Sequence, residues 1–253
     1  GDPTALAAAL DATALPTGSL RRNAGGAVGE LAGYAEGQWW VQDTAATLPA
    51  LLLGPVAGRH IVDLCAAPGG KTAQLAAAGA RVTALDIAAS RLSLVEENLA
   101  RLGLNADCVV ADANSWQPPT PVDGVLLDAP CTATGTLRRH PDIAWLKGPR
   151  DVAATVALQD RLLASALAML APGGTLVYAV CSLQPEEGPA RIAALLGAGA
   201  PAERLPVAPD ELPGLAGLDP AAITPDGDLR TLPCHFAAEG GMDGFYAARL
   251  RRT

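Results

Sequence analysis

The chain contains five short apolar segments that alternate with helical segments, and this order restricts its fold more than any other feature. We expect strands at residues 60–65, 81–85, 108–111, 122–127 and 175–180. We expect helices at residues 71–78, 91–102 and about 151–170. Apolar strands that alternate with helices are typical of a parallel sheet that is covered on both faces. The sequence therefore predicts an open, doubly wound α/β sheet.

The two ends of the chain lack this pattern. Residues 1–20 are rich in alanine, so we interpret residues 1–36 as a leader or linker that remains from a longer protein and residues 37–253 as one domain. Residues 197–228 are rich in proline and glycine and predict loops with short insertions. Residues 244–250 alternate apolar and small side chains, which indicates an antiparallel edge strand that closes the sheet.

Cysteine content and hydropathy exclude several classes of protein. The five cysteines are too scattered to form a CxxC pair or a zinc-ligand spacing, so we expect neither a disulfide framework nor a bound metal. The sequence has no uninterrupted apolar run of about 18 residues and no signal-peptide pattern. We therefore expect a cytoplasmic protein without membrane contact, with a monomer as the default state.

The net charge of −8 argues against a protein that coats nucleic acid without specificity, because that mode depends on neutralising phosphates with Lys and Arg. Local basic patches are still compatible with an enzyme that acts on nucleic acid. The candidate patches are Arg21-Arg22, Arg138-Arg139-His140 and Arg249-Arg251-Arg252. Each of them could equally be an ordinary solvated surface.

Four of the expected strands are followed directly by a polar residue. These residues are Asp86, Asp112, Asp128 and Cys181. Ligands of open α/β sheets bind outside the carboxyl ends of the strands, where these side chains would meet. One aspartate in such a place can simply cap the following helix. Four polar residues at one edge favour a ligand site.

The first expected strand runs into a turn with two glycines, CAAPGGKT at residues 65–72. The glycines allow the backbone to approach a ligand closely, and the helix start behind them offers unpaired N–H groups to an anion. The turn matches neither GxxxxGK[ST] nor GxGxxG. Asp86 is placed to bind a ribose hydroxyl pair, and Asp112 is placed near an adenine. The site therefore fits an adenosine that carries an amino-acid carboxylate better than it fits a dinucleotide.

Two of the cysteines stand at this ligand edge. A single cysteine is more often a small buried apolar side chain than a nucleophile, and we interpret Cys65, Cys108 and Cys234 in that way. Cys131 and Cys181 instead follow the fourth and fifth strands, in turns flanked by proline or serine. Together with the aspartate after the fourth strand they provide a thiol and an acid beside the cofactor. Spacing alone does not decide which thiol attacks.

Four motifs resemble those of the Fmu/Sun type of ribosomal RNA cytosine-5 methyltransferases, relatives of the nucleolar Nop and NSUN enzymes. They are GQWWVQD at residues 37–43, DLCAAPGGKT at residues 63–72, DAPCTATG with RRHPD at residues 128–142, and VCSLQPEE at residues 180–187. The resemblance covers roughly residues 37–249. It implies a Rossmann-like class I methyltransferase domain that uses S-adenosylmethionine to methylate carbon 5 of a cytosine in RNA.

The resemblance also implies a role for each reactive residue. Cys181 adds to C6 of the cytosine, and Cys131 helps to release the product. Asp128 holds the amino edge and N3 of the base, and Lys71 contacts the base or the cofactor carboxylate. The expected cofactor-binding residues are Cys65, Ala66, Ala67, Pro68, Gly69, Gly70, Lys71, Asp86, Arg91, Asp112 and Asp128.

The expected partner is RNA whose target base is unstacked, because an enzyme that acts on a base must take it out of the stack. The resemblance favours 16S ribosomal RNA of the small subunit, and a transfer RNA stays as an alternative. Residues 138–140 lie just past the DAPCTATG segment, where an RNA strand entering the site would pass.

Two other classes of function stay open. One is a protein or DNA methyltransferase on the same fold, although amino-directed nucleic-acid methyltransferases carry an aromatic residue where this chain has Cys131. The other is a non-catalytic cofactor-binding module that assists ribosome assembly. Replacement of Cys181 distinguishes this module from an enzyme, because only an enzyme would lose its function.

Overall fold

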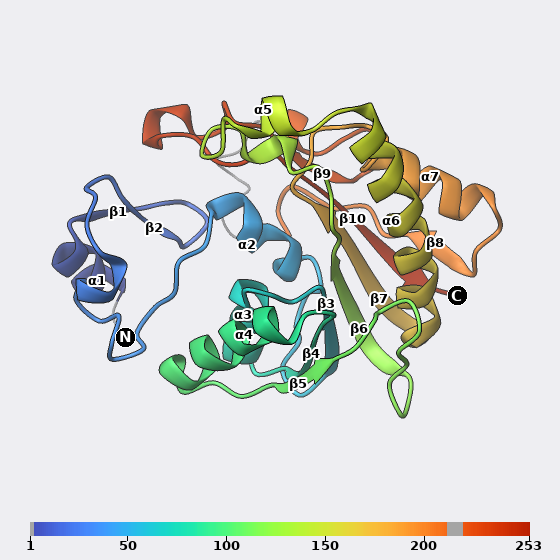
Figure 1. The fold of residues 1–253 in the computed structure, drawn as a ribbon, viewed down its shortest axis with the longest axis horizontal. Coiled ribbons are helices and arrows are strands. Elements are labelled where there is room, and N and C mark those ends of the chain that lie inside the picture. Colours follow the sequence, from blue (N-terminus) through green and yellow to red (C-terminus); the bar gives the residue numbers. More distant parts are fainter. Residues whose placement is uncertain (1–2, 212–219) are drawn as a thin grey trace.

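The computed structural model of this chain describes residues 3–211 and 220–253, and its centre is an eight-stranded sheet (Figure 1). The strands of this sheet are β3 (His60–Leu64), β4 (Arg81–Asp86), β5 (Asp107–Val110), β6 (Val122–Asp128), β7 (Leu170–Val180), β8 (Ala202–Arg204), β9 (Leu229–Thr231) and β10 (Phe245–Arg252). They lie in the order β5-β4-β3-β6-β7-β10-β8, and β9 pairs with β10. Strands β3 to β7 are parallel, whereas β10 is antiparallel to β7. The predicted doubly wound, mostly parallel sheet is confirmed.

Helices cover both faces of the sheet (Figure 1). One face carries α2 (Thr44–Leu51), α3 (Gly70–Ala77) and α4 (Ala89–Leu102). The other face carries α6 (Pro149–Met169) and α7 (Pro189–Gly197). This arrangement buries the central strands on both sides, which is why β6 and β7 are mostly apolar.

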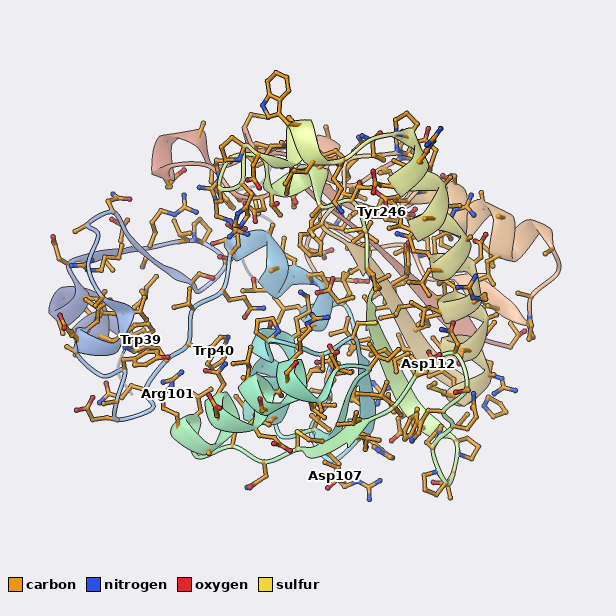
Figure 2. All side chains as sticks on the ribbon, viewed as in Figure 1. Trp39, Trp40, Arg101, Asp107, Asp112 and Tyr246 are labelled. Atoms are coloured by element: carbon orange, nitrogen blue, oxygen red, sulfur yellow. The ribbon has the colours of Figure 1, made fainter. Side chains whose placement is uncertain are left out.

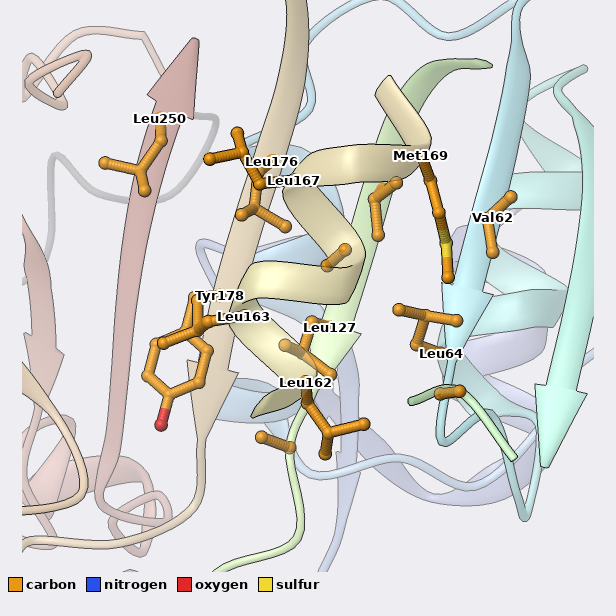
Figure 3. Close-up of a cluster of buried hydrophobic side chains, with 14 of the residues drawn as sticks. Val62, Leu64, Leu127, Leu162, Leu163, Leu167, Met169, Leu176, Tyr178 and Leu250 are labelled. Carbon is orange, nitrogen blue, oxygen red and sulfur yellow. The ribbon is translucent and has the colours of Figure 1, made fainter. Parts of the chain in front are cut away.

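Successive strand residues divide between the two faces. Ile61 belongs to the core beneath α2, while its neighbour Val62 belongs to the core beneath α6. Figure 3 shows the second core, in which Leu163 of α6 packs beside Leu127 and Tyr178 of the sheet. Each fully buried leucine of this kind stabilises the fold by about 1.5–3 kcal/mol relative to an exposed one.

Helix α6 is, among the described residues, the one helix that is long and apolar enough to cross a membrane by length and composition. Its buried residues include Leu162, Leu163 and Ala166, which pack on the sheet. The core helix of an α/β domain meets the same two criteria. Its apolar composition is therefore accounted for by the sheet that it covers.

Several short strands were not expected from the sequence, whereas a helix near the N-terminus was. Residues 3–22 form α1 (Pro3–Leu10) and a separate two-stranded sheet of β1 (Ala12–Ala14) and β2 (Leu20–Arg22). Beyond β10, which we expected to close the sheet, lie the three-residue strands β8 and β9. Strands of three residues are too short to show an alternating pattern. Part of the predicted loop at 197–228, residues 212–219, lies outside the described residues.

Candidate active site

A cavity of about 580 Å³ opens at the carboxyl ends of the central parallel strands. Its walls come from the loop after β3, from the segment 40–43 that precedes α2, and from the ends of β6 and β7. Cys65 to Lys71, Asp128 and Cys181 all line it. The structure thus brings most of the predicted site residues to one place.

The loop between β3 and α3 has a backbone that glycine makes possible. Gly69 has φ of 100°, in the left-handed region that favours glycine, and a Cβ there would lie 3.0 Å from a methyl carbon of Val95. Gly70 begins α3, and no side chain caps this helix start. The first N–H groups of the helix therefore have no partner within it and border the cavity. Burial raises the pKa of the Cys65 thiol to about 12, so it stays neutral, as its packing role requires.

Asp86 and Arg91 brace this loop from behind. The Asp86 carboxylate accepts hydrogen bonds from the backbone N–H groups of Ala67 and Ala88, at 3.3 and 3.1 Å. Arg91 lies 3.5 Å from the same carboxylate and donates to the Ala67 carbonyl at 3.0 Å. Asp112, labelled in Figure 2, is exposed, and its Oδ1 accepts from the backbone and side chain of Asn114. Within the described residues, none of these three predicted cofactor ligands lines the cavity.

Asp63 was quoted in the cofactor motif but given no role, and the structure makes it a candidate. It is 1% exposed, lines the cavity, and accepts a 2.6 Å hydrogen bond from Thr72. Its Oδ1 is buried and has no hydrogen-bond partner among the described residues. Burial raises the pKa of Asp63 to about 7. The sequence signal was its position, one residue before the end of a buried strand.

Lys71 and Asp128 form an ion pair in the cavity wall. The Lys71 Nζ lies 2.7 Å from Asp128 Oδ2 and 5.1 Å from the ring centre of Phe245. Burial alone would lower the pKa of Lys71, but the charge and hydrogen bond of Asp128 raise it above its ordinary value. Lys71 is therefore a cation at neutral pH, and its charge also faces Cys181.

The sulfur atoms of Cys131 and Cys181 lie 3.5 Å apart, although fifty positions separate them in the chain. The hydrogen bond with Cys181, together with burial, raises the pKa of Cys131 well above its ordinary value. Cys131 therefore keeps its proton at neutral pH and can donate it to the other sulfur. Only Cys181 of the two lines the cavity.

The predicted basic patch at residues 138–140 is largely neutralised by carboxylates. Arg139 donates to both oxygens of Asp243, and Arg138 donates to Asp43 at 2.9 Å and to Asp243 at 3.2 Å. The backbone N–H of Asp243 donates to Asp43 at 3.0 Å. This cluster joins the segment before α2, the loop after β6 and the segment before β10. Arg138 and Arg139 therefore link the segments around the cavity, in addition to any contact with a partner.

The other two candidate patches also serve local structure. Arg21 and Arg22 donate to backbone carbonyls, at Glu239 and Leu10 respectively. Arg249 pairs with Glu211, Arg251 pairs with Glu203, and Arg252 donates to the Leu170 carbonyl. Within residues 3–211 and 220–253, no group of three His, Cys, Asp or Glu side chains is arranged to hold a metal ion.

Gly135 fastens the loop of Cys131 to the neighbouring strands. Its N–H donates to the Cys181 carbonyl at 3.0 Å, and its own carbonyl accepts from the Gly244 N–H at 2.8 Å. A Cβ at Gly135 would lie 1.9 Å from the Gly244 carbonyl oxygen. No side chain can therefore be added there without moving the backbone.

We predict that Gly135→Ala destabilises the protein by about 1–3 kcal/mol, the usual cost of overpacking a tight interior. The control is Gly197→Ala, because a Cβ at Gly197 meets no atom within 4 Å. Urea unfolding followed by circular dichroism measures both variants. Equal midpoints for Gly135→Ala and the unaltered protein would contradict the role given to this contact.

The chain matches the family described as 16S rRNA methyltransferase RsmB/F over residues 50–251. It is 42% identical over 237 residues to ribosomal RNA small subunit methyltransferase B of Erwinia tasmaniensis. The aligned region covers 92% of this chain and 51% of the relative. The protein of the same description from Vibrio cholerae is 44% identical over 230 residues, with coverages of 89% and 49%. The chain thus spans about half the length of these curated relatives.

The structure is also similar to that of NSun6 from Pyrococcus horikoshii with SFG, with a TM-score of 0.73 and 27% sequence identity. That similarity covers 90% of this chain and 56% of the other. It confirms the predicted Rossmann-like methyltransferase fold and the predicted kinship with the NSUN enzymes. Because the family match takes in most of the chain, including Cys131 and Cys181, this chain belongs to the 16S rRNA methyltransferase RsmB/F family.

Proposed function

We propose that this chain is the catalytic part of an enzyme that methylates carbon 5 of a cytosine in small-subunit ribosomal RNA. The observation that carries the proposal is the 3.5 Å approach of Cys131 and Cys181 beside the Lys71–Asp128 ion pair. Carbon 5 of cytosine is too weak a nucleophile to attack a sulfonium methyl group. The reaction therefore needs a thiol that adds to C6 and a proton donor at the polar edge of the base.

S-adenosylmethionine is the cofactor, and when bound it supplies an electrophilic methyl group. The residues present fit its amino-acid end. The unpaired N–H groups at the start of α3 suit its carboxylate, and the partnerless Oδ1 of Asp63 suits its ammonium group. Asp86, Arg91 and Asp112 stay proposed cofactor ligands, although none of them lines the cavity.

Cys181 begins the reaction. Its thiolate adds to C6 of the cytosine, so that a C–S bond forms and the electron pair moves toward N3. The Lys71 ammonium donates to Asp128 at 2.7 Å, and the pair can pass this proton to N3, while the carboxylate accepts a hydrogen bond from the exocyclic amine. Carbon 5 is then enamine-like and can accept the methyl group.

Cys131 completes the reaction. Its hydrogen bond with Cys181 is the largest cause of its raised pKa, and this bond weakens once Cys181 is a thioether. Cys131 can then lose its proton to solvent and take the proton from C5. The C6–S bond breaks, N3 returns its proton to the Lys71–Asp128 pair, and both thiols regain their starting state.

The short helix α5 (Ile143–Leu146) carries an exposed tryptophan that we propose contacts the RNA. Trp145 is 91% exposed and Leu146 is 68% exposed on this helix, which follows Arg139 of the cavity wall by a few residues. Figure 1 places α5 at the rim of the molecule, apart from the sheet. Lys147 and Arg150 continue the segment with positive charge. An unstacked base can stack on such a side chain while cations nearby meet its phosphates.

The test of the proposal is transfer of a tritiated methyl group from S-adenosylmethionine to purified small-subunit ribosomal RNA, followed by nuclease digestion. We expect the label in 5-methylcytidine, and its loss in Cys181→Ala with cofactor binding unchanged. A protein of the relatives' full length serves as the positive control for RNA capture. Label in another nucleoside, or none with either length of protein, would contradict the proposal.

The two thiols should behave differently when they are removed singly. We predict that Cys131→Ala accumulates a covalent protein–RNA adduct, because the adduct forms but is released slowly. Cys181→Ala should form none, because no sulfur is left to add to C6. A denaturing gel after incubation with RNA and cofactor measures this, and equal trapping by both variants would make the assignment wrong.

Trp145→Ala should raise the KM for RNA by about tenfold or more, since stacking of one base contributes about 1–3 kcal/mol. The kcat at saturating RNA and the Kd of the cofactor should stay unchanged. Val110→Ala is the matched control, because Val110 is 54% exposed on β5. An unchanged KM for Trp145→Ala would exclude α5 from the RNA surface.

A further inference from the structure

Glu187 is a buried carboxylate that the reaction described above does not use. Its side chain is 0% exposed, and within residues 3–211 and 220–253 it forms no ion pair with a Lys, Arg or His side chain. A buried carboxylate without a cation must be held by hydrogen bonds, since the cost of removing its charge from water is otherwise large. The hydrogen-bond donors around Glu187 therefore show which segments of the chain this carboxylate connects.

The donors come from both cysteine loops. The residue after Cys131 is Thr132, whose N–H and hydroxyl donate to Glu187 at 2.9 and 2.5 Å. The residue after Cys181 is Ser182, whose hydroxyl donates to Glu187 at 2.5 Å. One carboxylate thus binds the immediate neighbours of both sulfur atoms.

Helix α6 supplies the remaining donors. The Thr155 hydroxyl donates to Glu187 at 2.5 Å, and the Gln159 amide donates to it at 3.4 Å. The same Gln159 amide donates to the Pro130 carbonyl at 2.8 Å, just before Cys131. The carboxylate is therefore anchored to a core helix as well as to the two loops. A rigid element behind a pair of reacting groups is what holds them in a fixed geometry.

We propose that Glu187 is a positioning residue that clamps the loops after β6 and β7 together and so holds the sulfur atoms of Cys131 and Cys181 within reach of each other. Its relevance to catalysis rests on the two-thiol reaction proposed above. The clamp itself is a property of the folded chain and can be measured without RNA.

Two substitutions separate the hydrogen bonds of Glu187 from its charge. Glu187→Gln keeps the shape: the amide oxygen can accept where Oε1 does, and the amide nitrogen can donate to the two hydroxyls, which turn to accept. Glu187→Ala removes the clamp and the charge together. Glu186→Gln is the matched control, because Glu186 is the exposed neighbour in the same turn.

The measurement is the rate at which the dithiol oxidises with diamide. Each Cys131–Cys181 disulfide that forms releases two electrons and two protons, which reduce the diazene to a hydrazine. Peptide mass spectrometry identifies the bond. We expect Glu187→Ala to slow this oxidation by about tenfold, because loosened loops lower the effective concentration of one thiol at the other. Glu187→Gln and Glu186→Gln should stay within about twofold of the unaltered protein.

A second variant covers the case in which Glu187→Ala does not fold by circular dichroism. Thr132→Val with Ser182→Ala removes both hydroxyl donors of the loops and leaves the carboxylate bound to α6 and to the Thr132 N–H. It should slow the oxidation as Glu187→Ala does. A folded variant of either kind that oxidises at the unaltered rate would overturn the proposal, and so would a Glu187→Gln protein as slow as Glu187→Ala.

Titration of the Cys131 thiol supplies an independent test. A purely structural role of Glu187 would leave the pH midpoint for alkylation of Cys131 unchanged. The titratable groups that face Cys131 are Cys181, Tyr178 and Glu187, and the negative charge of Glu187 contributes to the raised pKa of Cys131. In a Cys181→Ala background, Glu187→Gln should therefore lower the pH midpoint for alkylation of Cys131. An unchanged midpoint would contradict a charge held next to this sulfur.

Methyl transfer links the clamp to the proposed reaction. Glu187→Ala should lower kcat by about a hundredfold, with the Kd of the cofactor unchanged, and Glu187→Gln should recover most of it. If the unaltered protein methylates no cytosine, the proposed function fails while the oxidation rates still decide the clamp. If it methylates and Glu187→Ala matches it in kcat, the positioning role fails alone.

Discussion

The register of the parallel strands is the constraint on which the site depends. Leu64 of β3 pairs with Leu127 of β6, and Leu127 pairs with Tyr178 of β7, so the three strands end at one level. The loops that follow them carry the cofactor turn, the Asp128–Cys131 segment and Cys181. A slip of one residue in β6 would turn Asp128 to the opposite face of the sheet. The two buried cores fix this register, and the reactive side chains meet because of it.

Within this frame the charges of the cavity are arranged in opposed pairs. Lys71 is held by Asp128, and Arg138 and Arg139 are held by Asp43 and Asp243. Such pairing explains how an acidic chain can present cations at the place where a nucleic acid would react. Paired guanidinium groups stay where the carboxylates put them, so an incoming base meets a preorganised surface. The net charge alone does not reveal this arrangement.

The sequence was sufficient to predict the sheet and the parallel direction of its central strands, because apolar periodicity indicates both. It also predicted that Asp128 and Cys181 follow strands that end at the same edge of the sheet. It was not sufficient for the hairpin of β1 and β2 or for β8, whose strands are too short to show a pattern. Arg139 and Asp243 are far apart in the chain, and the sequence around each of them does not predict that they form an ion pair. For the same reason the sequence could not show that Glu187 would be buried close to Cys131.

The most direct test of the account uses RNA in which every cytidine carries fluorine at carbon 5. A base cannot remove fluorine as it removes a proton, so the adduct formed by the attacking thiol persists after methyl transfer. Protease and nuclease digestion followed by mass spectrometry then identifies the cysteine attached to the pyrimidine. We expect a methylated fluorocytidine on the peptide that contains Cys181. Attachment to Cys131, or a methylated product without any covalent adduct, would contradict it.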